Sequence, residues 1–286
     1  MQLIALVANL EKRGIREVAT GIITYLEERG VRTIIARKQA LALGVPERGV
    51  AEQELQGADC LLVLGGDGTL LQAARQVCTS ATPILGINLG RLGFLTEVEL
   101  ADLYPALDKL LTGDYHIEQR MMLQSTVKRP DQILTCTALN DIVVTKGAFP
   151  RLLSLEVYIS SDYLDTYPAD GLIVATPTGS TAYSLSAGGP LLTPDLRVML
   201  LTPICPHTLY ARPLVVPGKH QIEIHVHAPE VEVMLAVDGQ QGLSLRNGDV
   251  ITVTEASTTT QLIRLQDKTF FSLVRQKLQE GGNRQL

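Results

Sequence analysis

Cysteine is scarce in this sequence of 286 residues, and the four that occur are far apart: Cys60, Cys78, Cys136 and Cys205. No Cys-x-x-Cys pair is present, so the spacing of redox motifs and of common zinc sites is missing. We therefore expect buried free thiols in a reducing compartment rather than disulfides or metal ligands.

The sequence also lacks long apolar runs and an excess of positive charge. No run approaches the roughly 20 apolar residues of a membrane span, so we expect no membrane association. The formal net charge of −5 argues against nucleic acid as a general partner. Residues 1–7 carry no basic leader and no cleavage site, and are typical of a first strand rather than a signal peptide. These features predict a cytoplasmic protein.

The first part of the chain alternates strand-like and helix-like segments. Short apolar runs predict strands at 3–8, 31–36, 60–64 and 83–87, and helical spacing of apolar residues predicts helices at 15–29, 70–77 and 100–111. Residues 38–57 are expected to be irregular because Gly44, Pro46 and Gly49 interrupt them. Strand and helix in repetition predict an α/β domain over residues 1–117, with a Rossmann-like parallel sheet.

After about residue 117 the pattern changes to short alternating runs. Apolar and polar residues alternate over 221–227, and similar runs follow at 231–237, 243–245, 250–253 and 262–265. Turn signals lie at 238–239 and 247–249. We therefore expect a mostly antiparallel, all-β second domain over residues 118–267. Helical spacing returns at 270–278, and we expect this C-terminal helix (268–286) to pack back onto the first domain.

The segment Leu-Leu-Val-Leu-Gly-Gly-Asp-Gly-Thr-Leu-Leu at 61–71 is the most informative part of the chain. A buried strand, a glycine turn and the start of a helix bring free N–H groups and the positive end of the helix dipole to one place, which suits a phosphate. The candidate phosphate-binding residues are Gly65, Gly66, Gly68 and Thr69. Neither the Gly-Lys-Ser/Thr of a P-loop nor the Gly-x-Gly-x-x-Gly of dinucleotide folds is present.

Asp67 is unexpected in such a loop because its carboxylate repels a phosphate unless a metal ion or an attacking hydroxyl lies between them. The loop therefore predicts phosphoryl transfer with Asp67 as base or metal ligand. The alternative is a tight strand-to-helix turn in which Asp67 only caps the helix.

Residues 170–190 contain a second unusual motif, in which hydroxyl side chains crowd around Pro177 and Gly179 after the buried strand 172–175. Such hydroxyls can bind ribose, phosphate and base edges without net positive charge. The alternative is that Thr178 or Ser180 only caps a short helix.

Three further groups are candidates for the site. Asn140 and Asp141 interrupt an apolar β run and either point into a cleft or form a bulge or strand-end turn. Phe94, in the glycine-spaced loop 88–95, either stacks on a base or packs in the core. His225 and His227 share the solvent face of their strand with no third ligand type, so we expect surface residues rather than a metal site.

With these motifs assembled, the chain resembles the NAD kinase family over nearly its whole length and in the same order. The matching segments are 65–69, 88–95, 140–141, 176–184 and 238–240. Gly-Gly-Asp-Gly also occurs in lipid kinases and phosphofructokinase, whereas the hydroxyl-rich segment is more specific. Two positions depart from the pattern: Leu10 follows Asn9 where many members have proline, and Asp141 stands where many have glutamate.

The resemblance implies transfer of a phosphoryl group from ATP or polyphosphate to the 2′-hydroxyl of the adenosine ribose of NAD, giving NADP. It implies that Asp67 is the catalytic residue, as base or as orienting carboxylate, in a cleft between the two domains. A divalent ion such as Mg²⁺ would be held on the donor phosphates rather than by protein side chains alone.

The resemblance also implies a dinucleotide site lined by Gly68, Phe94, Asn140, Asp141, Thr178, Thr181, Ala182, Tyr183, Ser186 and Asp238. Asp170 and the segment near Cys205 would reach NAD from a neighbouring subunit, so a homodimer or homotetramer with shared active sites is expected.

Two rival functions fit part of the pattern. A lipid kinase needs an apolar acceptor pocket, against which the hydroxyl-dense segment argues. A non-catalytic NADP sensor gains nothing from a carboxylate beside phosphates, so Asp67 argues against it.

Overall fold

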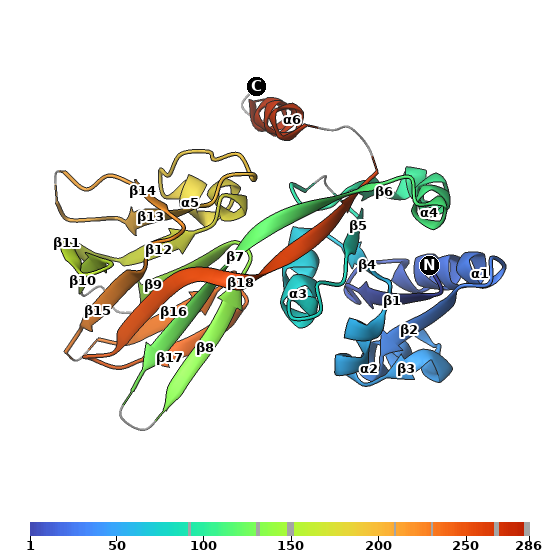
Figure 1. Cartoon of the computed structure of the whole chain (residues 1–286), viewed down its shortest axis with the longest axis horizontal. Coiled ribbons are helices and arrows are strands. Elements are labelled where there is room, and N and C mark those ends of the chain that lie inside the picture. The colour runs from blue at the N-terminus through green and yellow to red at the C-terminus, as the bar shows by residue number, and fades with distance from the viewer. Residues whose placement is uncertain are drawn as a thin grey trace. The chain divides into compact units, whose positions relative to one another are not determined.

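The computed structural model describes residues 1–90, 93–129, 132–147, 152–208, 210–229, 231–265 and 269–282 (Figure 1). The chain divides into two compact units: unit 1 comprises Met1–Gln119 with Thr260–Leu286, and unit 2 comprises Arg120–Thr259. Both divisions fall inside long strands, β7 (His116–Lys128) and β18 (Val250–Arg264). The domain limits expected from the sequence, at 117/118 and 267/268, stay predictions.

The described residues of the first part of unit 1, Met1–Gln119, form a parallel β-sheet and four α-helices (Figure 1). Its strands are β1 (Leu3–Ala8), β2 (Arg32–Ala36), β3 (Gly49–Val50), β4 (Cys60–Gly65), β5 (Ile84–Asn88) and β6 (Val98–Glu99). Its helices are α1 (Ile15–Glu27), α2 (Arg37–Leu43), α3 (Asp67–Val77) and α4 (Leu103–Thr112), with 3₁₀ turns at Pro46–Arg48, Glu52–Gly57 and Leu100–Asp102.

The strands of unit 1 pair in the order β5-β4-β1-β2-β3, with β6 beside β5, and all of these pairings are parallel. In β1, Ile4 and Leu6 pack in one cluster with residues of α1 and α4, while the intervening Ala5 and Val7 are also buried. Burial of successive residues is typical of a parallel sheet covered on both faces. The predicted α/β domain is therefore confirmed.

The prediction of an irregular segment at 38–57 is wrong, because Arg37–Leu43 forms helix α2 and two 3₁₀ turns follow it. All seven residues of α2 (Arg, Lys, Gln, Ala, Leu, Ala, Leu) are strong helix formers, but the helix is too short to show a periodic apolar stripe in the sequence. Ala40 and Leu43 are its buried residues, and Gly44 ends it in the left-handed region at φ 85°.

Unit 2 consists mainly of antiparallel strands. In addition to β7 and β18 they are β8 (Ile133–Ala138), β9 (Asp141–Lys146), β10 (Leu153–Ile159), β11 (Asp162–Ala169), β12 (Gly171–Ala175), β13 (Val198–Ile204), β14 (Leu214–Pro217), β15 (Ile222–His227), β16 (Val233–Val237) and β17 (Gln241–Leu245). A 3₁₀ turn at Thr178–Thr181 and the short helix α5 (Tyr183–Ser186) follow β12.

One sheet of unit 2 has the strand order β14-β13-β12-β9-β16-β17, and a second layer includes β11-β10-β15-β18 and the β7-β8 pair. A single apolar cluster, with Leu155, Leu172, Leu235 and Val253 among its members, draws residues from both layers. This confirms the antiparallel second domain. The predicted strands at 250–253 and 262–265 are parts of one strand, β18, whose intervening residues carry no turn signal.

The C-terminal helix is present as α6 (Phe270–Gly282), which confirms that element. Its packing onto the first domain stays a prediction. Among the described residues, no helix has the length and apolar character needed to cross a membrane.

Candidate active site

The glycine loop of unit 1 joins β4 to α3 as the sequence predicts. Gly65 ends the strand, and a Cβ there would overlap the side chain of Thr69. Gly66 is the N-cap residue of α3 and Asp67 its first residue, and no side chain caps this helix. The alternative that Asp67 caps α3 is therefore wrong, and the carboxylate has other partners.

Asp67 holds the segment that follows β5. Its Oδ2 accepts a hydrogen bond from the backbone N–H of Phe94 (2.7 Å), and its Oδ1 accepts from Leu95 (3.1 Å) and Thr96 (3.3 Å). An ionised carboxylate has about four lone-pair sites, so about one remains for a further donor. Gly93 is required here, because a Cβ at this position would overlap the carboxylate of Asp67.

Arg264, at the end of β18, bonds the same segment. Its guanidinium donates to the carbonyl oxygen of Leu95 (3.2 Å), to Glu97 Oε2 (3.1 Å) and to Glu118 Oε2 (2.6 Å). Glu97 Oε1 also accepts from the N–H of Leu265 (3.0 Å). Neither Arg264 nor Glu97 is predicted from the sequence, since 167 positions separate them and neither lies in a recognisable motif.

Other residues of the predicted loop 88–95 are placed as follows. Asn88 is buried, and its side chain closes a turn by bonding the N–H and the carbonyl of Gly90. Phe94 is half-buried and is not a member of the core cluster of unit 1, so its predicted contact with a base stays open. Arg91 and Leu92 lie outside the described residues.

In unit 2, Asn140 lies in the connection between β8 and β9, which bears out the strand-end alternative for its backbone. The carboxylate of Asp238 organises this connection by accepting the N–H groups of Leu139 (3.2 Å), Asn140 (2.7 Å) and Asp141 (3.2 Å). Asp238 itself adopts φ 49° in the turn after β16. Within the described residues, Asn140 Oδ1 is buried and has no hydrogen-bond partner.

Asp141 is 4% exposed and lies close enough to Asp238 for their charges to interact. Burial raises the pKa of Asp141 to about 7, and the negative charge of Asp238 adds to this effect. Near neutral pH this side chain therefore exists both as a carboxylic acid that can donate and as a carboxylate that only accepts.

The hydroxyl-rich segment contains two kinds of hydroxyl. Three are buried and bonded within the protein: Thr176 to the carbonyl of Leu139 (2.6 Å), Ser180 to that of Pro177 (2.6 Å), and Ser184 to Thr202 Oγ1 (2.9 Å). These three hydroxyls have structural roles, and none of them is among the residues that the resemblance selects for the dinucleotide site.

The remaining candidates in this segment are Thr178, Thr181, Ala182, Tyr183 and Ser186. Thr178 is buried, Thr181 and Ala182 are half-buried, and Tyr183 and Ser186 are exposed. The resemblance had selected these five.

Gly179 brings the hydroxyl-rich turn against the Asn140 connection. The N–H of Thr176 donates to the carbonyl oxygen of Asn140 (2.8 Å), and a Cβ at Gly179 would overlap that same carbonyl group. Unit 2 thus gathers Asn140, Asp141 and Asp238 beside the turn 176–179. Asp170 is not part of this group, because it precedes β12 and pairs with Lys146 Nζ at 2.5 Å.

Two family models match the chain: residues 4–115 match the ATP-NAD kinase N-terminal domain, and residues 139–265 match the ATP-NAD kinase C-terminal domain. The chain belongs to the NAD kinase family. The first model includes Asp67 and the segment it holds. The second includes Asn140, Asp141 and Asp238. Each of the two hydrogen-bonded clusters therefore lies in a domain characteristic of the family.

Relatives and solved structures of NAD kinases match most of the chain. The NAD kinase of Moorella thermoacetica is 70% identical over 285 residues, covering 100% of this chain and 92% of the relative. That of Desulforamulus reducens is 44% identical, covering 99% of each. Yeast NADH kinase, complexed with NADH, has 30% identity and a TM-score of 0.87 over 96% of this chain and 86% of its own. The NAD kinase from Archaeoglobus fulgidus, in complex with ATP, has 25% identity and a TM-score of 0.77 over 97% and 99%.

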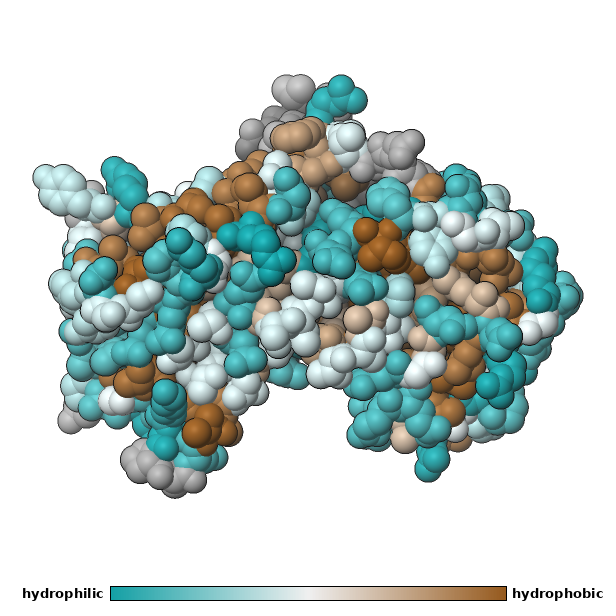
Figure 2. Space-filling model, in the orientation of Figure 1, coloured by the Kyte–Doolittle hydropathy of each residue, from teal (hydrophilic) through white to brown (hydrophobic). Residues whose placement is uncertain are grey.

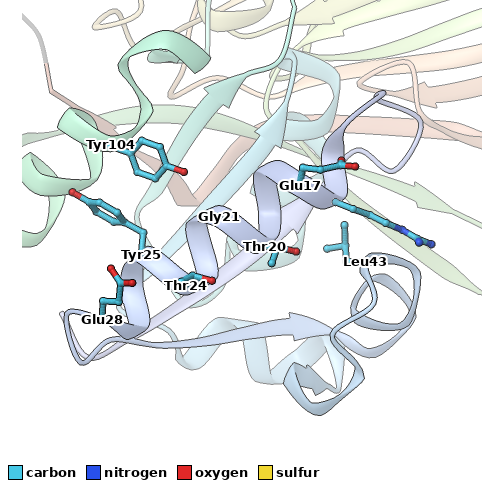
Figure 3. A pocket seen from close by; sticks show the side chains of 9 residues that line it. Glu17, Thr20, Gly21, Thr24, Tyr25, Glu28, Leu43 and Tyr104 are labelled. Atoms are coloured by element: carbon cyan, nitrogen blue, oxygen red, sulfur yellow. The ribbon is translucent and has the colours of Figure 1, made fainter.

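An open groove of about 660 Å³ lies along α1 in unit 1 (Figure 3). Leu43 of α2 and Tyr104 of α4 contribute to its walls, and the rings of Tyr25 and Tyr104 lie 4.8 Å apart. None of the residues that line it belongs to the motifs found in the sequence. We therefore assign this groove no part in the NAD kinase reaction.

The histidines and cysteines have no metal-binding arrangement among the described residues. His225 Nε2 lies 2.6 Å from Glu223 Oε1, and His227 Nε2 lies 3.0 Å from Glu156 Oε2. All four cysteines are free thiols. Only Cys60 is buried, which raises the pKa of its thiol to about 12, and the expectation of burial is wrong for the exposed Cys205.

Proposed function

We propose that this chain transfers the terminal phosphoryl group of ATP to the 2′-hydroxyl of the adenosine ribose of NAD, giving NADP, and that Asp67 accepts the hydroxyl proton. One observation carries the assignment of the base: the Asp67 carboxylate lies at the glycine loop and keeps about one lone-pair site after accepting three backbone N–H groups. A ribose hydroxyl is a weak nucleophile until a base takes its proton. Polyphosphate is the alternative phosphoryl donor.

The donor set around the loop fits a Mg²⁺ ion bound mainly by the donor phosphates. Mg²⁺ prefers oxygen ligands and is commonly held by one or two carboxylates together with substrate phosphates. Asp67 is the carboxylate of the loop, but in this proposal its one remaining lone-pair site accepts the hydroxyl proton, so the donor phosphates would supply the ligands of the ion. The ion would neutralise charge on the transferring group. The backbone N–H groups of the loop and the N-terminus of α3 would orient the phosphates.

The dinucleotide would bind to the polar groups of unit 2. The side-chain oxygen Oδ1 of Asn140 is buried and could accept a hydrogen bond from the dinucleotide. The side chain of Asp141 could pair with a hydroxyl. Thr178, Thr181, Ala182, Tyr183 and Ser186 would complete this surface. For Asp238 we now propose a positioning role, because three of its lone-pair sites hold the backbone of 139–141.

We propose that the active sites are shared between subunits of a homodimer or homotetramer. Asp170 lies at the opposite end of β12 from the turn at Thr178, and five strand residues span about 17 Å. A second copy of the chain is a simple source of an Asp170 that reaches the same NAD molecule. Exposed apolar side chains on α5, on β14 and between them supply an interaction surface (Figure 2): Tyr183, Leu185, Leu191, Leu196, Leu214 and Val215.

A mixing experiment tests the shared site. Asp67→Asn and Asp170→Ala subunits are each expected to be inactive, and co-expressed hybrids are expected to regain part of the activity because some sites contain both intact residues. Absence of recovery in hybrids shown by tandem-tag purification to have formed would contradict sharing, as would full activity in a monomer.

The activity itself is tested with purified protein, NAD, Mg²⁺ and either ATP or polyphosphate, following NADP formation. We expect NADP with at least one donor and almost none with Asp67→Asn. Failure of the wild-type protein to form NADP with either donor would overturn the proposed reaction.

We place the protein in the cytoplasm, a proposal supported by its free thiols.

A further inference from the structure

Arg120 is a buried arginine beside the hydroxyl-rich turn that no motif of the sequence identified. It lies in β7, is 6% exposed, and its Nη1 donates to Thr178 Oγ1 at 3.1 Å. Burying a guanidinium is costly unless hydrogen bonds compensate. The hydrogen bond to Thr178 supplies part of that compensation.

Thr178 differs from the other buried hydroxyls of its segment. Thr176, Ser180 and Ser184 donate to or exchange hydrogen bonds with groups of the protein fold. The Thr178 hydroxyl instead accepts from a charged side chain. Among the described residues it donates to no protein acceptor, although a hydroxyl has one proton to give.

The turn itself is held without that hydroxyl. The N–H of Gly179 donates to Thr176 Oγ1 (3.0 Å), and Thr181 Oγ1 donates to the carbonyl oxygen of Thr178 (3.1 Å). The backbone of 176–181 therefore keeps its fold if the side chain of Thr178 loses its oxygen. The hydroxyl is thus available for a role other than turn formation.

We propose that Arg120 is a positioning residue for the dinucleotide. Because its N–H occupies an acceptor site of Thr178 Oγ1, the hydroxyl proton is directed away from the guanidinium and toward an oxygen acceptor of bound NAD. The positive charge polarises the hydroxyl and makes it a stronger donor. This inference rests on the proposed NAD site in unit 2 and adds to it a residue that does not touch the ligand.

The test uses a double-mutant cycle between Arg120→Met and Thr178→Val in the full-length protein. Each single variant is expected to raise the KM for NAD about ten-fold, the size expected for losing a charge-assisted hydrogen bond, while kcat changes less than about two-fold. The double variant is expected to resemble either single variant, because both remove the same donation. The KM for ATP should stay within about two-fold of the wild-type value.

Conservative variants and a matched control separate positioning from folding. Thr178→Ser keeps the hydroxyl and is expected to recover most of the NAD affinity lost in Thr178→Val. Thr202→Val removes the partner of the structural hydroxyl Ser184, and is expected to lower the melting temperature without raising the KM for NAD. Should Arg120→Met fail to fold, Arg120→Lys replaces it in the same cycle, with a smaller expected rise in KM.

Multiplicative effects in the double variant, or a parallel rise of both KM values together with a lower melting temperature, would overturn the inference. So would equal losses in Thr178→Ser and Thr178→Val. These outcomes are measured against an active wild-type protein. They are therefore distinct from failure of the proposed function, in which the wild-type protein itself forms no NADP.

Discussion

The two units each contain an aspartate whose carboxylate accepts three consecutive backbone N–H groups, and the two arrangements differ in surroundings rather than in pattern. In both, Oδ1 accepts two N–H groups and Oδ2 accepts one. Asp67 begins a helix after a glycine loop and is half-buried. Asp238 sits in a turn with φ 49°, is 7% exposed, and has the carboxyl group of Asp141 nearby.

This comparison shows that a hydrogen-bond pattern does not by itself identify a catalytic group. The Asp67 carboxylate lies next to backbone N–H groups that suit a phosphate, so a proton acceptor at this position can take part in phosphoryl transfer. Asp238 lies near the carboxyl group of Asp141, and its hydrogen bonds hold the backbone segment that carries Asp141. The same three bonds hold the segment 94–96 in unit 1 and, in unit 2, the residues 139–141, which include the pair proposed to bind the dinucleotide.

The largest expected difference between the two aspartates is in turnover. Asp67→Asn is expected to lower kcat for NADP formation at least ~100-fold, because the amide cannot accept the ribose proton. Asp238→Asn is expected to change kcat much less and to raise the KM for NAD, because the backbone of 139–141 shifts. Steady-state kinetics with both substrates measures these effects.

Both substitutions are expected to lower the melting temperature, because an asparagine NH₂ faces backbone donors in each cluster. Loss of stability is therefore the shared effect, and loss of turnover is specific to Asp67. A fall in kcat of the same size in Asp238→Asn would remove the distinction between the two residues. Near wild-type turnover in Asp67→Asn would mean that Asp67 only holds the segment 94–96 and is not the catalytic base.

The glycines that face the two clusters provide a second comparison. A Cβ at Gly179 would overlap the backbone carbonyl of Asn140, whereas one at Gly93 would overlap only the side chain of Asp67. Gly179→Ala is therefore expected to destabilise the protein by about 1–3 kcal/mol, as overpacking does. Gly93→Ala is expected to cost less stability and to reduce kcat, because the Asp67 carboxylate moves.

Urea denaturation and NADP formation measured on both variants check this prediction. Gly188→Ala is a poor control because Gly188 has φ 89°, while Gly66→Ala introduces a Cβ with nothing within 4 Å and serves for stability alone. Equal destabilisation by Gly93→Ala and Gly179→Ala would show that the Asp67 side chain has no freedom to move.

Much of this architecture follows from local patterns in the sequence. The buried runs of β1 and β4 and the glycine turn before α3 each need only neighbouring residues to be recognised. The contacts of Asp67 with 94–96 and of Asp238 with 139–141 join positions 27 to 99 residues apart. The spacing of apolar and polar residues along the chain does not predict such contacts. The resemblance indicated which motifs act in the reaction. Within the hydroxyl-rich segment it selected Thr178, Thr181, Tyr183 and Ser186, and it left out Thr176, Ser180 and Ser184, whose hydroxyls bond the protein.

A substitution of Asn140 tests the dinucleotide site proposed for unit 2. Its buried Oδ1 has no partner among the described residues, so the folded protein without ligand gains little from it. Asn140→Ala is expected to weaken NAD binding by about 1–3 kcal/mol through the groups left unpaired in the complex. Its melting temperature without NAD is expected to change little. Calorimetric titration with NAD and thermal unfolding give the two values, and a large loss of stability with unchanged NAD affinity would assign Asn140 to the fold.

The smallest effect concerns the pH dependence of stability that Asp141 confers. The pKa of Asp141 is raised to about 7 in the folded protein by burial and by Asp238, whereas an unfolded aspartate titrates near 3.8. Between these values the folded state holds a proton that the unfolded state has released. Stability is therefore highest below the unfolded pKa and falls as pH rises through about 7.

Asp141→Asn removes this dependence, because the amide resembles the protonated acid and has no proton to lose. Between pH 6 and pH 8 the wild-type protein is expected to lose about 1.4 kcal/mol of unfolding free energy relative to the variant, from one group passing through a pKa of about 7. Urea denaturation without NAD at pH 6, 7 and 8 measures the difference between the two proteins. Asp238→Asn is expected to show a weaker version, because Asp141 then titrates lower but stays buried. Parallel stability profiles for wild type and Asp141→Asn would mean that Asp141 is ionised throughout this range, and its place beside Asp238 would need another source of stabilisation.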